Sequence, residues 1–160
     1  MSPVAVRNPY DNSDDEDAAA QSGQGGTSLL TEIDHIAIAV FDLGAAIDTY
    51  RDTFGATVEH REVVESDGVE EAMLRVAESY VQLLTPTSDE SPVAKFLERR
   101  GEGLHHIGYR VADCAAALEA VKAQGHRVID EAPRPGSRGT TVAFIHPKAI
   151  CGTLVELVQE

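Results

Sequence analysis

The sequence contains one pattern twice, and each copy carries a potential metal ligand at the same place. The first copy begins DHIAIAV, continues with a helical segment and later reads VQLL, whereas the second begins HHIGYRV, continues in the same way and later reads VELV. Aligning the copies places His35 on His106 and Gln82 on Glu156. Because a repeat of this kind forms one supersecondary unit per copy, the pattern predicts two equivalent modules that pack together.

Hydrophobic periodicity predicts the order strand, helix, strand, strand, strand in each copy. A short helix at 91–100 joins the copies, and prolines and glycines at 133–139 predict a loop before the last two strands. The expected fold class is α+β: two tandem βαβββ modules with curved mixed sheets that enclose a metal-binding cleft. The expected strands are 31–40, 56–64, 69–77 and 80–86 in the first module and 104–111, 126–133, 140–147 and 153–160 in the second, with helices at 43–54 and 114–124.

The chain divides into a tail and one domain. Residues 1–28 are acidic, polar and poor in large apolar side chains, so we expect a disordered tail. Residues 29–160 are expected to form a single domain, with modules at about 31–86 and 103–159.

Charge and hydropathy exclude several classes of function. The formal net charge of −14 argues against nucleic-acid binding, which requires a basic face. It also means that an anionic ligand must find a local cluster of cations. No apolar run reaches the ~18 residues of a membrane span, and the N-terminus lacks the pattern of a secretory signal. Cys114 and Cys151 form no CxxC pair, so we expect reduced thiols in a cytoplasmic protein, with a disulfide between them as the alternative.

Side-chain alternation shows which residues share a face of each first strand. His35 lies on the same face as Ala37 and Ala39, whereas the isoleucines of that strand lie on the other, which should pack on the helix. The small neighbours of His35 leave room for a ligand. In the second copy the same parity selects His106 rather than the preceding histidine, together with Gly108.

The four residues at equivalent repeat positions predict a metal site. Gln82 and Glu156 are polar residues inside otherwise apolar strands, and together with His35 and His106 they offer two imidazoles, a carboxylate and an amide oxygen. Taken singly, each would more often be an ordinary buried or exposed polar residue. This donor set suits a divalent cation such as cobalt, manganese, iron, nickel, zinc or magnesium. In an octahedral sphere it would leave two positions open for a substrate.

A further acid is a candidate for acid and base chemistry. In the strand after the turn at 66–68, Glu71 shares a face with Met73, opposite the apolar face formed by Ala72 and Leu74. Glu71 is therefore expected to face the cleft. The alternative is a solvated glutamate at the edge of a strand.

The chain resembles the vicinal oxygen chelate superfamily and, within it, the methylmalonyl-CoA epimerase family. The resemblance covers about residues 31–159. DHIAIAV alone is a signal of the superfamily, whereas SPVAKFLERRGEGLHHI together with HPK and the final LVELVQ is much more specific to the epimerases.

The resemblance implies a mechanism and a set of site residues. It implies a divalent metal held by His35, Gln82, His106 and Glu156, with the thioester and carboxylate oxygens of the substrate in the open positions. Glu71 and Glu156 match the two catalytic carboxylates, one for each face of the α-carbon. The reaction would interconvert the R and S forms by α-proton abstraction and reprotonation through a metal-stabilised enolate. A carboxylate that also binds the metal is a weakened base, so the double role of Glu156 has no explanation in the sequence. The family also implies a homodimer.

An acyl-CoA substrate needs donors for its phosphates and carboxylate. The loop PRPGSRGTT offers Arg134, Ser137 and Arg138, and Lys148 follows in HPK. The alternative for each residue is an ordinary solvated turn.

Three other functions are compatible with this superfamily. A glyoxalase-type isomerase would act on glutathione thiohemiacetals. An extradiol dioxygenase would use two histidines and one glutamate on iron, and Gln82 in the fourth place speaks against it. A non-catalytic drug-sequestering protein would hold its ligand between aromatic rings, but the chain has no Trp and only 5% aromatic residues.

Overall fold

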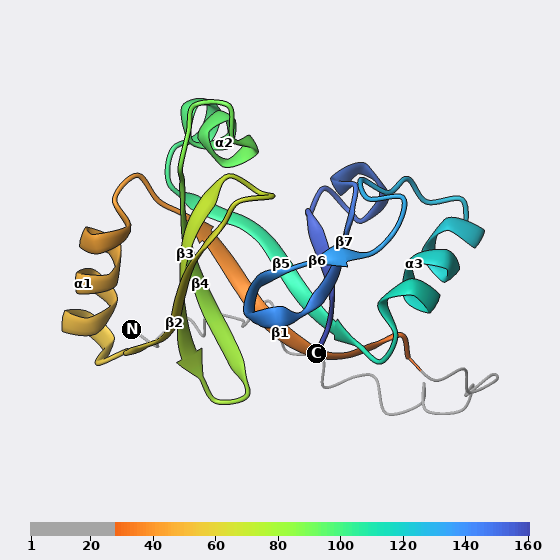
Figure 1. Ribbon diagram of the computed structural model, residues 1–160, viewed down its shortest axis with the longest axis horizontal. Coiled ribbons are helices and arrows are strands. Elements are labelled where there is room, and N and C mark those ends of the chain that lie inside the picture. The colour runs from red at the N-terminus through yellow and green to blue at the C-terminus, as the bar shows by residue number, and fades with distance from the viewer. Residues whose placement is uncertain (1–27) are drawn as a thin grey trace, which may run out of the picture.

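Eight strands form one curled mixed sheet in the computed structural model, which describes residues 28–160 (Figure 1). The expectation of a disordered tail therefore concerns residues outside the described range, Ser28 excepted. The strand order is β2-β3-β4-β1-β5-β8-β7-β6. The strands are β1 (Leu30–Ala39), β2 (Val58–Val64), β3 (Val69–Val76), β4 (Ser79–Pro86), β5 (Gly103–Val111), β6 (Arg134–Pro135), β7 (Thr141–Ile145) and β8 (Val155–Gln159).

The strand order reads as two equivalent halves joined at their first strands. In the first half β1 pairs in parallel with β4, and in the second β5 pairs in parallel with β8. The first strands, β1 and β5, pair with each other in antiparallel orientation at the centre of the sheet. This arrangement confirms the expected pair of tandem βαβββ modules.

The register of the two parallel pairs is equivalent. Gln82 of β4 lies opposite Ala37 of β1, and Glu156 of β8 lies opposite Gly108 of β5. Ala37 and Gly108 occupy the same position two residues after His35 and His106. The alignment of the two sequence copies is thus reproduced by the hydrogen-bonding register.

One helix covers the outside of each module. Helix α1 (Leu43–Phe54) begins after Asp42, whose side chain accepts from the Ala45 N–H, and α3 (Cys114–Ala123) begins after Asp113 in the same way. These two helices lie at opposite ends of the molecule (Figure 1). Each packs on the apolar face of its own half of the sheet, so that the opposite faces curve around a shared interior.

The third helix, α2 (Pro92–Arg100), covers part of the inner face instead. Its buried residues Val93 and Leu97 pack on Ala37 and Ala39. Both alanines are fully buried, so the expected space beside His35 is partly filled by this helix. The expectation that the isoleucine face of β1 packs on a helix holds only in part, because Ile36 on that face is 38% exposed.

The predicted strand at 126–133 is wrong. Only Val128 forms an isolated bridge, to Ile145. The N–H groups of Ile129 and Asp130 both donate to the Phe144 carbonyl, and the Asp130 side chain accepts from the Phe144 N–H, so the ladder stops there. Pairing resumes in the expected loop, where β6 lies at the edge of the sheet. Pro135 has no backbone N–H to donate, which is tolerated in an edge strand.

Both cysteines are free thiols: Cys114 is buried and Cys151 is exposed, so the alternative of a disulfide between them is wrong. Among residues 28–160, no helix combines the length and apolar character needed to cross a membrane.

Candidate active site

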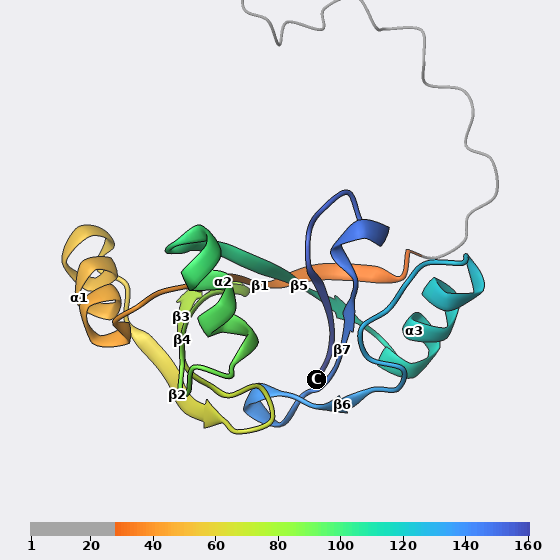
Figure 2. The same cartoon turned by 90° about the horizontal axis from the view of Figure 1, so that it is seen from above.

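The curled sheet encloses a cavity of about 200 Å³ between the two modules. Seen from above, the outer edges of the sheet, β2 and β6, turn toward each other (Figure 2). The backbone N–H of Arg138, in the turn Ser137–Gly139 that follows β6, donates to Glu62 of β2 at 2.7 Å and links these edges. All four expected metal ligands and Glu71 line this cavity.

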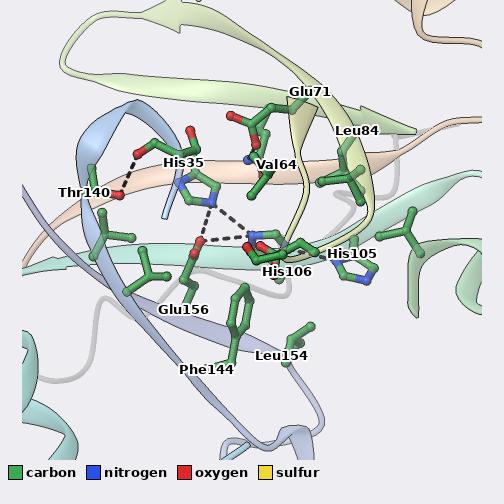
Figure 3. A pocket seen from close by; sticks show the side chains of 18 of the residues that line it. His35, Val64, Glu71, Leu84, His105, His106, Thr140, Phe144, Leu154 and Glu156 are labelled. Atoms are coloured by element: carbon green, nitrogen blue, oxygen red, sulfur yellow. Dashed lines mark hydrogen bonds and ion pairs between the residues drawn. The ribbon is translucent and has the colours of Figure 1, made fainter. Parts of the chain in front are cut away.

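His35, His106 and Glu156 converge on one point of the cavity (Figure 3). Glu156 Oε2 lies 2.9 Å from His35 Nε2 and 3.3 Å from His106 Nε2, and the two imidazole nitrogens are 3.0 Å apart. Adjacent ligands of an octahedral ion at 2.0–2.2 Å are separated by ~3 Å. The spacing of these three donors therefore fits a divalent cation between them, and the triad could bind one.

Gln82 completes this donor set with an oxygen that has no partner. Its Nε2 donates to Glu71 Oε2 at 2.5 Å, which leaves its Oε1 buried without a hydrogen bond among the described residues. A buried acceptor of this kind is costly unless something satisfies it. A bound cation would do so.

Glu156 and His35 stabilise each other's charged forms, whereas burial lowers the pKa of His106. Burial alone would raise the pKa of Glu156, but hydrogen bonds from His106 and His35 outweigh burial and hold it well below the usual range. Burial would likewise lower the pKa of His35, but the contacts with Asp34 and Glu156 raise it to about 9. Without a metal, the site is thus an ion pair of anionic Glu156 and protonated His35 at neutral pH.

Asp34 contacts the Nδ1 side of the His35 ring, a role that the sequence alone does not predict. Its side chain is fully buried, and Oδ1 lies 2.7 Å from His35 Nδ1. Arg110 donates to Oδ2 at 3.0 Å and Arg138 donates to Oδ1 at 2.6 Å. The contact between Asp34 Oδ1 and His35 Nδ1 places a proton on Nδ1 and leaves Nε2 to bind a metal. An aspartate directly before the strand histidine was the signal available in the sequence.

His106 is oriented in a similar way by its neighbour. The Nδ1 atoms of His105 and His106 are 2.8 Å apart. Burial, followed by the neighbouring His106, lowers the pKa of His105 to about 4, so His105 is a neutral acceptor. If His106 Nε2 binds a cation, its Nδ1 carries the proton and donates to His105.

Gly108 is required by the close approach of His35. A Cβ on Gly108 would lie 2.6 Å from His35 Nδ1 and closer still to Cε1. The backbone conformation of Gly108 is not left-handed, so the constraint is the imidazole ring and not the turn geometry. Strand alternation predicts that Gly108 lies on the same face as His106, but it does not predict this contact.

Glu71 is buried in the cavity with an unused oxygen. Its side chain is 2% exposed, Oε2 accepts from Gln82, and Oε1 has no hydrogen bond among the described residues. Burial raises the pKa of Glu71, while the nearby Ser137 and Gln82 partly oppose this effect. A carboxylate with a raised pKa and a free oxygen is suited to accept and return a proton.

Of the other expected substrate contacts, Arg134, Ser137 and Arg138 line the cavity and Lys148 does not. Ser137 lines the cavity beside Glu71, and its Oγ makes no hydrogen bond of good geometry within the described range. Arg138 also lines it, but its guanidinium is held by Asp34 and lies over the Tyr80 ring at 4.7 Å. Arg134 forms ion pairs with Asp67 and Asp130 at 2.9 and 3.3 Å. Lys148 is exposed and lies outside the cavity lining.

Comparisons with known proteins agree with this architecture. Residues 34–144 match the family model of the Glyoxalase/Bleomycin resistance protein/Dioxygenase superfamily. The ethylmalonyl-CoA/methylmalonyl-CoA epimerase of Cereibacter sphaeroides is 40% identical over 133 residues, which are 82% of this chain and 99% of that protein.

Solved structures that resemble this chain are also methylmalonyl-CoA epimerases. The crystal structure of methylmalonyl-CoA epimerase from Mycobacterium tuberculosis has a TM-score of 0.81 and 39% identity, over 85% of this chain and 92% of that chain. A methylmalonyl-CoA epimerase in complex with methylmalonyl-CoA and NH4+ has a TM-score of 0.80 and 46% identity, over 82% of this chain and 95% of that chain.

Proposed function

Because the chain belongs to the Glyoxalase/Bleomycin resistance protein/Dioxygenase superfamily, we propose that it is an epimerase which interconverts the R and S forms of methylmalonyl-CoA. Support comes from the epimerases to which it is similar and from the donor set of the cavity. The observation that carries the proposal is the placement of two buried glutamates, Glu71 and Glu156, in one cavity with two histidines.

The chemistry of the substrate explains this set. The proton to be moved lies between a thioester carbonyl and a carboxylate, and its removal leaves negative charge on the thioester oxygen. A divalent cation held by His35, Gln82, His106 and Glu156 would supply a Lewis acid for that charge. Inversion needs a base on one face of the carbon and an acid on the other.

We assign the two proton-transfer roles to Glu71 and Glu156. Glu71 carries the raised pKa and an unpaired oxygen, so it is the stronger base of the two. Glu156 is stabilised as an anion by both histidines, which makes it the weaker base of the two. Ser137, beside Glu71, is positioned to donate to a substrate oxygen.

The metal, the assembly and the compartment are further parts of the proposal. The mixed nitrogen and oxygen donors favour cobalt, manganese, nickel, zinc or magnesium. The homodimer is proposed from the resemblance to the epimerase family. The free, exposed thiol of Cys151 suits the reducing cytoplasm. Light scattering of the purified protein tests the dimer, and metal analysis tests the cation.

The activity is tested by exchange of the α-proton in heavy water. Metal-loaded protein should incorporate deuterium into methylmalonyl-CoA and convert a single epimer into a mixture of the R and S forms, whereas chelator-treated protein should do neither. If no divalent metal supports exchange, the epimerase proposal fails. The same samples would then be assayed with glutathione thiohemiacetals, the substrates of a glyoxalase-type isomerase.

A further inference from the structure

A second cluster of potential metal ligands adjoins the candidate metal site. It consists of His60, Glu62 and Glu71, whose donor atoms all lie within 4.8 Å of one another. The antiparallel pairing of β2 with β3 places Glu62 directly opposite Glu71. His60 lies on the same face of β2 as Glu62, because side chains alternate along a strand. The three side chains therefore come together on one face of the sheet.

No cationic side chain balances the two carboxylates of this cluster. Like charges directly opposite each other on paired strands destabilise the pairing. Two other glutamates of the same strands, Glu59 and Glu70, each form an ion pair with an arginine. Within residues 28–160, neither Glu62 nor Glu71 forms an ion pair with a lysine or an arginine. A bound cation would relieve this repulsion.

Three polar atoms at the cluster also lack a hydrogen bond among the described residues. They are His60 Nε2, Glu71 Oε1 and the Oγ of the neighbouring Ser137. Glu71 is only 2% exposed, so its unpaired oxygen is costly unless something satisfies it. His60 Nε2 lies 2.9 Å from Glu62 Oε1 without the geometry of a hydrogen bond. Unsatisfied lone pairs of a nitrogen and an oxygen beside a further carboxylate form a donor set for a cation.

We propose that His60, Glu62 and Glu71 bind a second divalent cation, which inhibits the enzyme by occupying Glu71. One imidazole and two carboxylates suit zinc or manganese. A carboxylate bound to a cation is a much weaker base, so this ion blocks the proton transfer assigned to Glu71. The inhibition rests on the proposed function, whereas the binding does not. The side chains of His60 and Glu62 are 37% and 34% exposed, so the second ion is held more weakly than the first and is removed by desalting.

Binding is tested by titrating metal-free protein with Mn²⁺ alone and measuring the free ion by electron paramagnetic resonance. Wild type should bind one ion tightly and a second more weakly. His60→Gln and Glu62→Gln should keep the first ion and weaken the second by about tenfold or more, because each removes a ligand. Glu70→Gln removes a carboxylate next to Glu71 that is paired with Arg61, and as the matched control it should bind both ions.

Two results of this titration would overturn the proposal. One is a single bound ion in wild type. The other is a second ion that all four proteins bind equally, because such an ion is held by the general negative charge of the chain. The two cluster variants are independent, so the test stands if one of them does not fold.

The activity of the same proteins tests the inhibition. Once the first site is filled, further Mn²⁺ should slow epimerisation by wild type and by Glu70→Gln, whereas the rates of His60→Gln and Glu62→Gln should not respond. An unchanged rate in wild type while the second ion binds would overturn the inhibitory role. If wild type binds the second ion but has no epimerase activity at any Mn²⁺ concentration, the second site is supported and the proposed function fails.

Discussion

Arg138 and Asp34 are joined at 2.6 Å across the interface between the two modules. The same aspartate oxygen contacts His35, so an arginine from the second module helps to orient a candidate metal ligand in the first. Arg138 has a left-handed backbone conformation, with φ of 56°, and its N–H donates to Glu62. These contacts indicate that Arg138 positions the loop of Ser137 and, through Asp34, the imidazole of His35.

The first prediction concerns Asp34. Asp34→Asn removes the buried charge that orients the His35 ring and balances Arg110 and Arg138, so metal affinity should fall by about 10- to 100-fold. The affinity is measured by competition with a metal indicator. Glu32→Gln, which removes an exposed partner of Arg110, is the control and should bind metal as wild type does. Equal affinities in both variants would show that Asp34 has no role at the site.

The second prediction separates proton transfer from metal binding. Glu71→Gln keeps the volume of the side chain but cannot accept the α-proton, so epimerisation should fall by about 10²- to 10⁴-fold. Metal content, measured by elemental analysis, should be unchanged. Glu70→Gln alters the adjacent residue, which pairs with Arg61 away from the cavity, and should remain active. Normal turnover by Glu71→Gln would disprove the two-base scheme.

The third prediction concerns pH and the proton on His35. In the metal-free protein the pKa of His35 is raised to about 9, so at neutral pH a metal must displace that proton. Apparent metal affinity should therefore rise by about tenfold per pH unit up to pH 9 and then level off. Calorimetry in buffers of different ionisation enthalpy should show about one proton released per metal at pH 7.5. An affinity independent of pH between 6 and 9 would contradict this assignment.

The fourth prediction concerns Gly108. Gly108→Ala would place a methyl group against the His35 ring and displace its Nε2, so metal affinity should fall by about tenfold or more while the fold is retained. Gly44→Ala is the control, because its nearest neighbour is 3.4 Å away on the surface of α1. It should raise the free energy of unfolding by ~0.5–1 kcal/mol and leave the metal affinity unchanged. Wild-type metal affinity in Gly108→Ala would show that the ring can move aside at no cost.

The gathering of the four expected ligands could be predicted because two simple rules act together. Alternation along a strand selects one face, and the repeat places equivalent residues at equivalent registers. Those rules locate His35, Gln82, His106 and Glu156 without any knowledge of distant contacts. The same alternation indicated that Glu71 faces the interior.

The rest depends on partners that lie far apart in the sequence. The arginines of the loop are visible as cations, but the carboxylates that hold them, Asp34 and Asp67, come from the first module. The false strand at 126–133 has a suitable apolar pattern, yet its donors converge on one carbonyl of Phe144. The local sequence does not show which carbonyl groups will accept the hydrogen bonds of this segment.

The equivalent registers of Gln82 and Glu156 have a consequence for stereochemistry. A single module supplies one imidazole and one oxygen donor, so two identical modules would surround a substrate with the same groups on both sides. Joining the modules in one chain allows them to diverge, and here one carries an amide beside Glu71 whereas the other carries a carboxylate. The near-symmetric framework can thus place carboxylates of unequal basicity, Glu71 and Glu156, around one carbon.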